Sequence, residues 1–338
     1  MQEIIIKKND SGQRVDKFLK RYLPNAGTSF IFKMMRKKNI ILNKQKVQGN
    51  EIIKENDCIQ IFFSEDTIDK FRNSNQAETN ALLIEYEKAY KKLNGIEIIY
   101  ENDDVLLLGK PSGILTQKAK PHDLTLNEWL IGYLLNKNEV CGETLSQFKP
   151  SVCNRLDRNT SGIVICGKTL YGTQTMSECI KTRTIHKYYH LFVVGCLEGE
   201  NTLTGYLLKD NDSNTVKIIN AKQKSNDLKD FITIETKYKS ISTAHEITYL
   251  EVELITGKTH QIRAHLSSIG HPILGDYKYG DATINRNLLS LGINDQMLHA
   301  YRLVFPPLKD RLSDLSEREF ICSEPDTFNI VKEKYFKE

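Results

Sequence analysis

The 338-residue sequence lacks a long apolar run, and its seven cysteines never form a Cys-x-x-Cys pair. Apolar runs such as residues 105–108 are only a few residues long, whereas a membrane-spanning helix needs about 18. We therefore expect no membrane insertion. The odd number and the scatter of the cysteines argue against a disulfide framework and against a zinc ribbon, so we expect reduced thiols.

The beginning of the chain lacks the features of a secretory signal, because the apolar stretch at residues 4–6 is short and no cleavage pattern follows it. A cytoplasmic protein is the resulting expectation. No internal repeat and no Gly-rich phosphate loop occur either. Residues 256–259 (Thr-Gly-Lys-Thr) match part of a phosphate-loop pattern, but Val252 stands where that pattern needs its first glycine. We therefore expect no nucleoside triphosphate site.

The net charge of +4 is divided unevenly along the chain. Residues 1–50 hold twelve Lys and Arg side chains against three acidic ones, hence +9, so the remainder carries −5. This concentration favours a phosphate-binding face, and its candidate residues are the cations on and beside two predicted helices: Arg14, Lys33, Arg36, Lys37, Lys38 and Lys44. A lysine-rich, solvated surface without a ligand is the alternative.

The spacing of apolar residues in this basic segment predicts two amphipathic helices, at residues 14–23 and from Thr28 onward, followed by short strands. Three stretches resemble the S-four-type RNA-binding module, an αL module: residues 14–19 (Arg-Val-Asp-Lys-Phe-Leu), 34–38 (Met-Met-Arg-Lys-Lys) and 41–47 (Ile-Leu-Asn-Lys-Gln-Lys-Val). The resemblance implies that residues 1–63 form a small domain that binds RNA.

Residues 64–93 are polar, without Gly or Pro, and predict a linker that has room for one helix. The composition changes near residue 96, and we expect a second domain at residues 94–330. Strand-like runs predominate there without a regular strand–helix alternation. We therefore expect an α+β fold whose second domain is a mixed, mostly antiparallel β-sheet with peripheral helices. The strands are expected at residues 96–100, 105–108, 163–166, 191–194, 247–254 and 303–305, and the helices at 124–135, 170–181 and 261–269.

One segment of the second domain places an acid between two cations. Asp157 stands between Arg155 and Arg158, ahead of the turn-forming residues 160–162 (Thr-Ser-Gly). Flanking positive charge favours the ionised form of a carboxylate, which can then act as a nucleophile or a base. The alternative is that Asp157 caps a turn while its neighbours form surface ion pairs.

A second segment lies at a strand-to-helix junction and collects five hydrogen-bond donors: Lys258, Thr259, His260, Gln261 and Arg263. Backbone N–H groups at such a junction add to an environment that binds anions. His260 and His265 are five residues apart and no carboxylate pair accompanies them at zinc spacing, so we expect no metal site.

Together these segments resemble the catalytic domain of the RNA pseudouridine synthases of the large ribosomal-RNA family, whose signature is Arg-Leu-Asp followed by Thr-Ser-Gly. Further matches occur in the family's order at residues 110–115, 187–189, 254–266 with 270–280, and 298–303. The chain departs from the family's pattern at Asn154, where His is common, and at Lys258, where Arg is common. Residues 116–118 replace the usual His-Pro, and the insert at residues 118–143 follows no part of the pattern.

The resemblance implies an enzyme that isomerises uridine in RNA, mostly 23S ribosomal RNA, to pseudouridine without a cofactor or a metal. It implies Asp157 as the nucleophile, Tyr189 as a ring-stacking partner and base, and Arg263 as the cationic partner of Asp157. Substrate contacts are expected from Arg155, Lys187, Leu254, Lys258, His260 and Gln261. We also expect a monomer.

Three alternatives stay open at this point. The chain could be a non-catalytic RNA-binding or ribosome-assembly factor on the same fold. It could also be a phosphate-ester hydrolase built on its histidines, and Tyr189 could be a core tyrosine of a strand.

Overall fold

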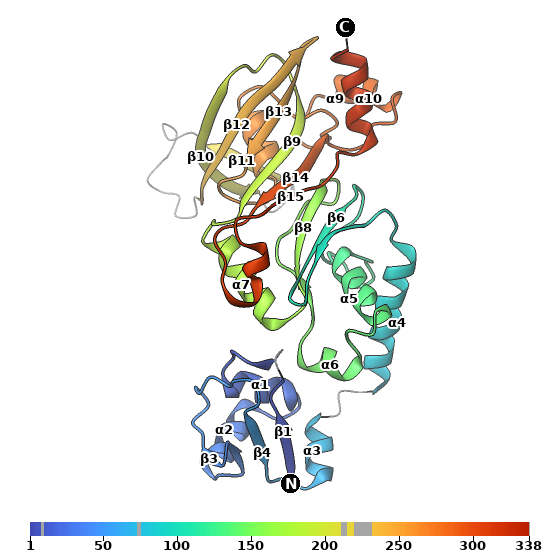
Figure 1. Ribbon diagram of the computed structural model, residues 1–338. Coiled ribbons are helices and arrows are strands. Elements are labelled where there is room, and N and C mark those ends of the chain that lie inside the picture. Colours follow the sequence, from blue (N-terminus) through green and yellow to red (C-terminus); the bar gives the residue numbers. More distant parts are fainter. Residues whose placement is uncertain (8–9, 73–75, 211–214, 220–231, 338) are drawn as a thin grey trace.

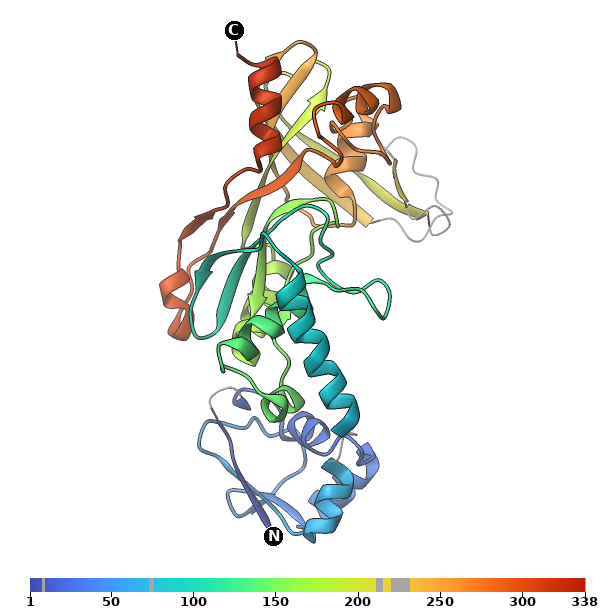
Figure 2. The same ribbon diagram turned by 90° about the vertical axis from the view of Figure 1, so that its right-hand side faces the viewer.

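The computed structural model shows an elongated molecule with its two termini at opposite ends (Figure 1 and Figure 2). The structure describes residues 1–7, 10–72, 76–210, 215–219 and 232–337. The N-terminal part has its own apolar core and comprises β1 (Gln2–Ile5), α1 (Val15–Tyr22), α2 (Thr28–Arg36), β2 (Ile40–Leu42), β3 (Gln45–Lys46), β4 (Cys58–Ile61) and α3 (Glu65–Arg72).

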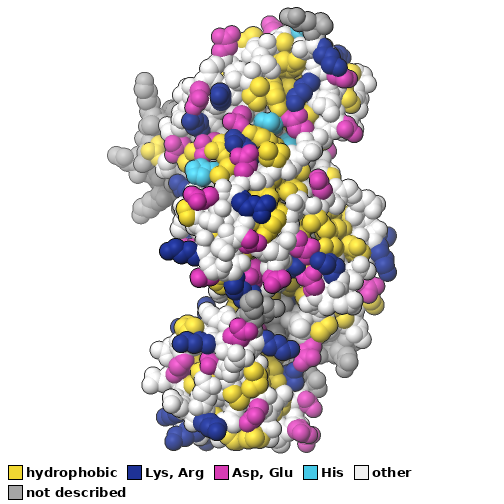
Figure 3. Space-filling view, in the orientation of Figure 1, with side chains coloured by type: hydrophobic (Ala, Val, Ile, Leu, Met, Phe, Trp, Pro, Cys, Tyr) yellow, Lys and Arg dark blue, Asp and Glu magenta, His cyan; other side chains and the backbone are white. Residues whose placement is uncertain are grey.

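Strands β1, β4, β2 and β3 form an antiparallel sheet in that order, and α1 and α2 bury the apolar faces that their spacing predicts. Phe18 and Met35, for example, lie in the core of this part of the chain. The six cations predicted to contact RNA are all exposed, and Arg14 forms an ion pair of 3.0 Å with Asp16. Figure 3 shows Lys and Arg side chains gathered at the lower left of this part.

The segment expected to be a linker differs from the prediction, because it contains two helices, α3 and α4 (Gln76–Lys92). Ile68 and Phe71 of α3 pack into the N-terminal core, whereas α4 packs along α5 (Leu126–Asn136) of the second part. The α4–α5 contact is close, since a Cβ atom on Gly132 would lie 2.2 Å from the carbonyl oxygen of Tyr86. Because a few apolar side chains are enough to pack these helices against their neighbours, the mostly polar composition of the segment did not predict that both helices are packed.

The remaining strands are β5 (Glu97–Glu101), β6 (Val105–Lys110), β7 (Ser151–Val152), β8 (Ser161–Gly167), β9 (His186–Val194), β10 (Glu200–Asp210), β11 (Thr215–Ile219), β12 (Ile232–Ala244), β13 (Ile247–Glu253), β14 (Leu298–Val304) and β15 (Glu319–Ile321). The remaining helices are α5 (Leu126–Asn136), α6 (Gly142–Gln147), α7 (Leu170–Lys181), α8 (Gln261–Ser268), α9 (Ala282–Leu289), the 3-10 helix η3 (Asp310–Leu315) and α10 (Asp326–Tyr335).

Within the described residues these strands form one eleven-stranded sheet with the order β11-β10-β12-β13-β9-β14-β8-β6-β5, while β15 pairs with β14 and β7 with β8. Among the described residues the paired strands of this sheet are antiparallel, except β14 with β8. The expected mixed, mostly antiparallel sheet with peripheral helices is therefore confirmed. The expected strands and the three expected helices are present, with ends shifted by a few residues.

Strands β10, β11 and β12 were not predicted. Strand β12 shows the reason, because its buried face uses Thr236 and Tyr238 beside Ile234, so polar residues occupy both faces. Such a strand lacks the apolar alternation that makes a strand visible in a sequence. None of the helices in the described ranges is both long enough and apolar enough to cross a membrane.

Candidate active site

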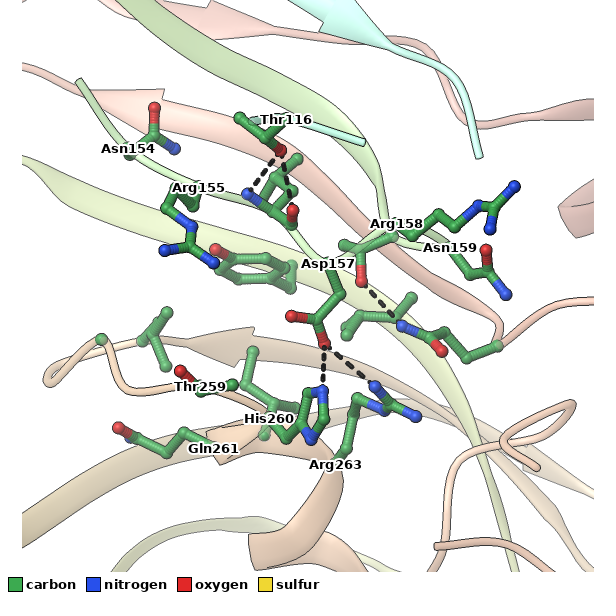
Figure 4. A pocket seen from close by; sticks show the side chains of 18 of the residues that line it. Thr116, Asn154, Arg155, Asp157, Arg158, Asn159, Thr259, His260, Gln261 and Arg263 are labelled. Carbon is green, nitrogen blue, oxygen red and sulfur yellow. Dashed lines mark hydrogen bonds and ion pairs between the residues drawn. The ribbon is translucent and has the colours of Figure 1, made fainter. Parts of the chain in front are cut away.

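A pocket of about 820 Å³ is lined by the loop between β7 and β8, by strand β9 and by the segment that joins β13 to α8 (Figure 4). The nine residues predicted for catalysis and substrate binding all line it: Asp157, Tyr189, Arg263, Arg155, Lys187, Leu254, Lys258, His260 and Gln261. Segments more than one hundred residues apart in the chain thus meet at one cavity, and the roles of the individual residues stay predictions.

Arg263 bridges two carboxylates at this pocket. Its Nη1 atom donates to Asp157 Oδ2 at 3.0 Å, and its Nε and Nη2 atoms donate to the two oxygens of Asp276 at 2.7 and 2.8 Å. Asp276 is fully buried, whereas the side chain of Asp157 is 28% exposed. Arg263 therefore makes its two-point contact with Asp276, whereas Asp157, its predicted partner, receives one hydrogen bond and stays partly exposed.

Burial and charge act against each other in this ion pair. Burial disfavours the charged form of Arg263, but the hydrogen bonds and negative charges of Asp276 and Asp157 outweigh it and raise the pKa of Arg263. Burial likewise disfavours ionised Asp276, but Arg263 and the backbone N–H groups of Lys278 and Tyr279 outweigh it and lower the pKa of Asp276. Arg263 is therefore a fixed cation next to Asp157.

His260 lies at the start of α8 in a left-handed backbone conformation, with φ at 55°. Such a conformation is unfavourable for a residue with a side chain and is often retained at functional sites. It brings His260 Nε2 to 3.8 Å from Asp157 Oδ2, too far for a hydrogen bond, while Nδ1 lies 3.0 Å from Tyr279 Oη. Burial lowers the pKa of His260 although Asp157 opposes it, so a neutral imidazole faces the carboxylate.

Gln261 has a structural environment, although it lies on the pocket wall. Its Oε1 atom accepts from Thr256 Oγ1 at 2.9 Å and from Lys258 N at 3.2 Å. Its Nε2 atom donates to the carbonyl of Glu235 and to Thr236 Oγ1, both at 2.9 Å. The amide ties the Thr-Gly-Lys segment to β12, and Figure 4 shows it directed away from Asp157. This geometry argues against the predicted substrate contact.

The Thr-Ser-Gly residues after Asp157 join the loop to the neighbouring strand β14 and to the segment just before it. Thr160 Oγ1 accepts from Gln296 Nε2 at 2.9 Å, and Ser161 Oγ is hydrogen-bonded to His299 Nδ1 at 2.8 Å. Gly162 has φ at 113°, and a Cβ atom there would lie 2.2 Å from the carbonyl oxygen of Ala300. Only glycine allows β8 and β14 to approach this closely, so the Thr-Ser-Gly residues fix where the Asp157 loop ends and β8 begins.

Two buried side chains hold the backbone on both sides of Asp157. The Oγ1 atom of Thr116 accepts from Leu156 N at 3.2 Å and donates to Leu156 O at 2.7 Å. Lys110 Nζ donates to the carbonyl of Arg158 at 3.0 Å and to two carbonyls of its own loop. Burial lowers the pKa of Lys110 to about 7, while the charges of Asp157 and Asp295 act in the opposite direction.

Strand β9 supplies Lys187 and Tyr189 to the pocket. Tyr189 is 5% exposed, and burial, together with the negative charge of Asp157, raises the pKa of its phenol. Tyr189 is therefore protonated at neutral pH in this structure. Burial, reinforced by the charge of Arg183, lowers the pKa of Lys187. Arg155 and Lys258, by contrast, are exposed at the pocket.

The nearby His265 lies inside the protein and does not line the pocket. His265 is buried against Thr236, at 3.0 Å, and burial lowers its pKa to about 4. No group of three or more His, Cys, Asp or Glu side chains in the described part of the chain is arranged to hold a metal ion. The histidine-based hydrolase therefore gains no support from the geometry.

Comparisons with known proteins match this arrangement to one family. The family model for RNA pseudouridylate synthase matches residues 104–268. An uncharacterized RNA pseudouridine synthase of Mycoplasma genitalium is 30% identical over 315 residues, which cover 91% of this chain and 90% of the relative. The chain belongs to the RNA pseudouridine synthase family. It is therefore an isomerase that converts uridine in RNA to pseudouridine.

Two further comparisons concern the type of synthase and the fold. Ribosomal large subunit pseudouridine synthase C of Vibrio cholerae is 27% identical over 312 residues, which cover 90% of this chain and 89% of the relative. The structure of human RNA pseudouridylate synthase domain containing 4 covers 77% of this chain and 97% of its own, with 21% identity and a TM-score of 0.55. That likeness shows a shared fold.

Sequence reasoning assigned no role to three residues of this pseudouridine synthase that the structure brings to its centre: Asp276, Thr116 and Lys110. Asp276 and Lys110 lie in stretches that match the family's pattern, so their presence was visible and their contacts were not. Thr116 lies where the sequence departs from that pattern, and no sequence signal linked it to Leu156.

Proposed function

We propose that this synthase isomerises specific uridines of large-subunit ribosomal RNA, with Asp157 as the nucleophile and without a cofactor or a metal. The observation that carries the proposal is the ion pair between Asp157 and Arg263 at 3.0 Å, on the wall of a pocket large enough for a nucleotide. Ribosomal RNA as the substrate is supported by the relatives from Vibrio and Haemophilus, which are named ribosomal large subunit pseudouridine synthase C.

The reaction begins with a uridine flipped out of its stack, which costs a few kcal/mol and is offset by protein contacts. Asp157 forms a covalent bond with the nucleotide, and the bond between C1′ and N1 of the uracil breaks. The ring rotates, C5 bonds to C1′, a proton leaves C5, and N1 gains a proton. The bond to Asp157 then breaks and regenerates the carboxylate, so product and substrate have the same atoms and electrons.

The neighbouring side chains suit this reaction. The protonated phenol of Tyr189 offers a ring on which uracil stacks, and it would accept a proton from the ring only once bound substrate lowers its pKa. Arg263 holds Asp157 in place, and Arg155 and Lys258 contact the RNA backbone at the exposed edge of the pocket. Lys187, Leu254 and His260 border the uridine.

The N-terminal part acts as an S-four-type RNA-binding module in this proposal. Its fold of two helices against a small sheet presents Lys33, Arg36, Lys37 and other cations to solvent, as a phosphate-binding surface requires. The enzyme works as a monomer in the cytoplasm, where it meets ribosomal RNA.

Substitution of Asp157 by Asn tests the proposal. The amide has the size of the carboxylate but cannot act as an anionic nucleophile, so turnover should vanish while the fold and the RNA affinity are kept. Turnover is measured as tritium released from RNA that carries tritium at C5 of its uridines. The matched control is Asp295→Asn, because Asp295 accepts from Ser112 Oγ at 2.7 Å near the same loop but does not line the pocket.

Two results would contradict the proposal. Measurable turnover by purified Asp157→Asn protein would remove Asp157 from its role. If pseudouridine mapping finds the same large-subunit ribosomal RNA positions modified in cells with and without this gene, ribosomal RNA is not the substrate. If the protein were a non-catalytic assembly factor, the mapped pseudouridines would be the same with and without the gene, and Asp157→Asn protein would bind RNA as the wild type does.

A further inference from the structure

An unpaired aromatic ring lies at the exposed edge of the pocket. Tyr277 lines the cavity and is 57% exposed. Among the described residues its hydroxyl makes no hydrogen bond and its ring makes no ring or cation contact. Tyr189, the other tyrosine of the pocket, is 5% exposed and belongs to the apolar core. The pocket thus has one tyrosine at its depth and another at its mouth.

The backbone on either side of Tyr277 is firmly held. Gly275 has φ at 76°, and a Cβ atom there would lie 2.2 Å from the carbonyl oxygen of Asp295. Asp276 is fixed by Arg263, and Tyr279 Oη accepts from Val216 N at 2.9 Å. A ring mounted on so rigid a turn loses little conformational entropy when a ligand covers it.

The chemistry of the expected ligand suits such a ring. Every RNA base has a π face, and exposed aromatic side chains bind unstacked bases by stacking on them. Since Tyr189 and Asp157 receive the target uridine inside the pocket, the base that reaches the mouth belongs to an adjacent nucleotide. The exposed cations Arg155 and Lys258, which also line the pocket, favour an RNA strand that crosses its mouth.

We propose that Tyr277 forms a stacking subsite for the base of a nucleotide that flanks the target uridine. This inference rests on the proposed function. Tyr277 follows Asp276, which binds the guanidinium of Arg263, and Arg263 in turn holds Asp157. A base stacked on Tyr277 therefore sets the position of the RNA strand relative to Asp157. Stacking tolerates any base, so Tyr277 contributes affinity and position while discriminating little between sequences.

The test compares full-length wild-type, Tyr277→Ala and Tyr277→Phe proteins on a ribosomal RNA fragment that the wild-type enzyme modifies. Loss of one stacked base weakens binding by about 5-fold to 150-fold. We expect KM of Tyr277→Ala to rise within that range with kcat nearly unchanged, and Tyr277→Phe to behave as wild type, since the ring remains. Leu289→Ala is the matched control, because Leu289 is 46% exposed but lies outside the pocket.

RNA fragments that lack the base on the 5′ or the 3′ side of the target uridine complete the experiment. The fragment that lacks the base stacked on Tyr277 should raise KM of the wild-type enzyme to the KM of Tyr277→Ala. Equal KM values for wild type and Tyr277→Ala on the intact fragment would overturn the subsite, as would a Tyr277→Phe protein as impaired as Tyr277→Ala. Failure of the wild-type enzyme to release tritium from any ribosomal RNA would instead overturn the proposed function.

Discussion

Removal of Arg263 should destabilise the protein through Asp276 and inactivate it through Asp157. In the Arg263→Ala variant, Asp276 stays fully buried and loses both hydrogen bonds from the guanidinium. It keeps the hydrogen bonds from the backbone N–H groups of Lys278 and Tyr279. Breaking a buried ion pair by removing one partner costs about 3 to 5 kcal/mol. Asp157 adds less to this loss, because water reaches its partly exposed side chain.

The double variant Arg263→Ala with Asp276→Asn separates the two effects. The amide removes the uncompensated buried charge, so unfolding by urea should show recovery of more than half of the lost free energy. Tritium release should remain lost, because Asp157 still lacks its cation. A double variant no more stable than Arg263→Ala would refute the view that the buried charge of Asp276 causes the loss, and so would an Arg263→Ala protein of native stability.

The pH dependence gives a second readout of the same reasoning. In the wild type the folded-state pKa of Asp276 lies below its ordinary value, so the stability it contributes is present above about pH 4 and is lost as the pH falls through the folded-state pKa. Without Arg263, burial becomes the main influence and raises that pKa. The stability difference between wild type and Arg263→Ala should therefore shrink as the pH is lowered from 7 to 4. A difference that stays constant over this range would contradict the explanation.

Two further predictions concern the loop and the basic face. Thr116→Val removes both hydrogen bonds to the backbone of Leu156 and should displace Asp157, so kcat should fall about 10-fold or more. Thr116→Ser keeps the hydroxyl and should retain most activity. An unchanged kcat for Thr116→Val would contradict the role of Thr116 in positioning Asp157. Replacing Lys33, Arg36 and Lys37 by Gln should reduce the slope of log K against log salt for RNA binding by about 0.7 to 0.9 per lost phosphate contact, and an unchanged slope would remove these cations from the RNA interface.

Much of the large sheet could be predicted from local sequence patterns, whereas the candidate site could be predicted only from the family resemblance. Apolar runs such as those of β6 and β8 are buried on both faces, so their strands were visible in the sequence. The residues of the pocket could be gathered because the family resemblance links segments that no local pattern connects. Spacing alone left Asp157 as either a nucleophile or a turn cap.

The contacts that orient the site could not be predicted. Gln261 looks like a donor for substrate in the sequence, but four neighbours from the loop and β12 use its amide. Asp276 is 13 residues from Arg263 along the chain, and only the turn beginning at Gly275 brings the two side chains together. Such contacts depend on tertiary packing, which hydrophobic period and turn chemistry do not specify.

The sharing of Arg263 between two carboxylates has a consequence for the reaction. Asp157, Asp276 and Arg263, when all are ionised, together carry one net negative charge, and in the proposed mechanism Asp157 loses its charge while it is bonded to the nucleotide. Because Asp276 keeps its two-point contact throughout, Arg263 is never left buried without a partner, and no side chain has to move to neutralise it. A cation fixed in advance costs no reorganisation during the reaction. In the proposed mechanism Asp276 thus keeps the guanidinium in the same position both while Asp157 is bonded to the nucleotide and after its carboxylate re-forms.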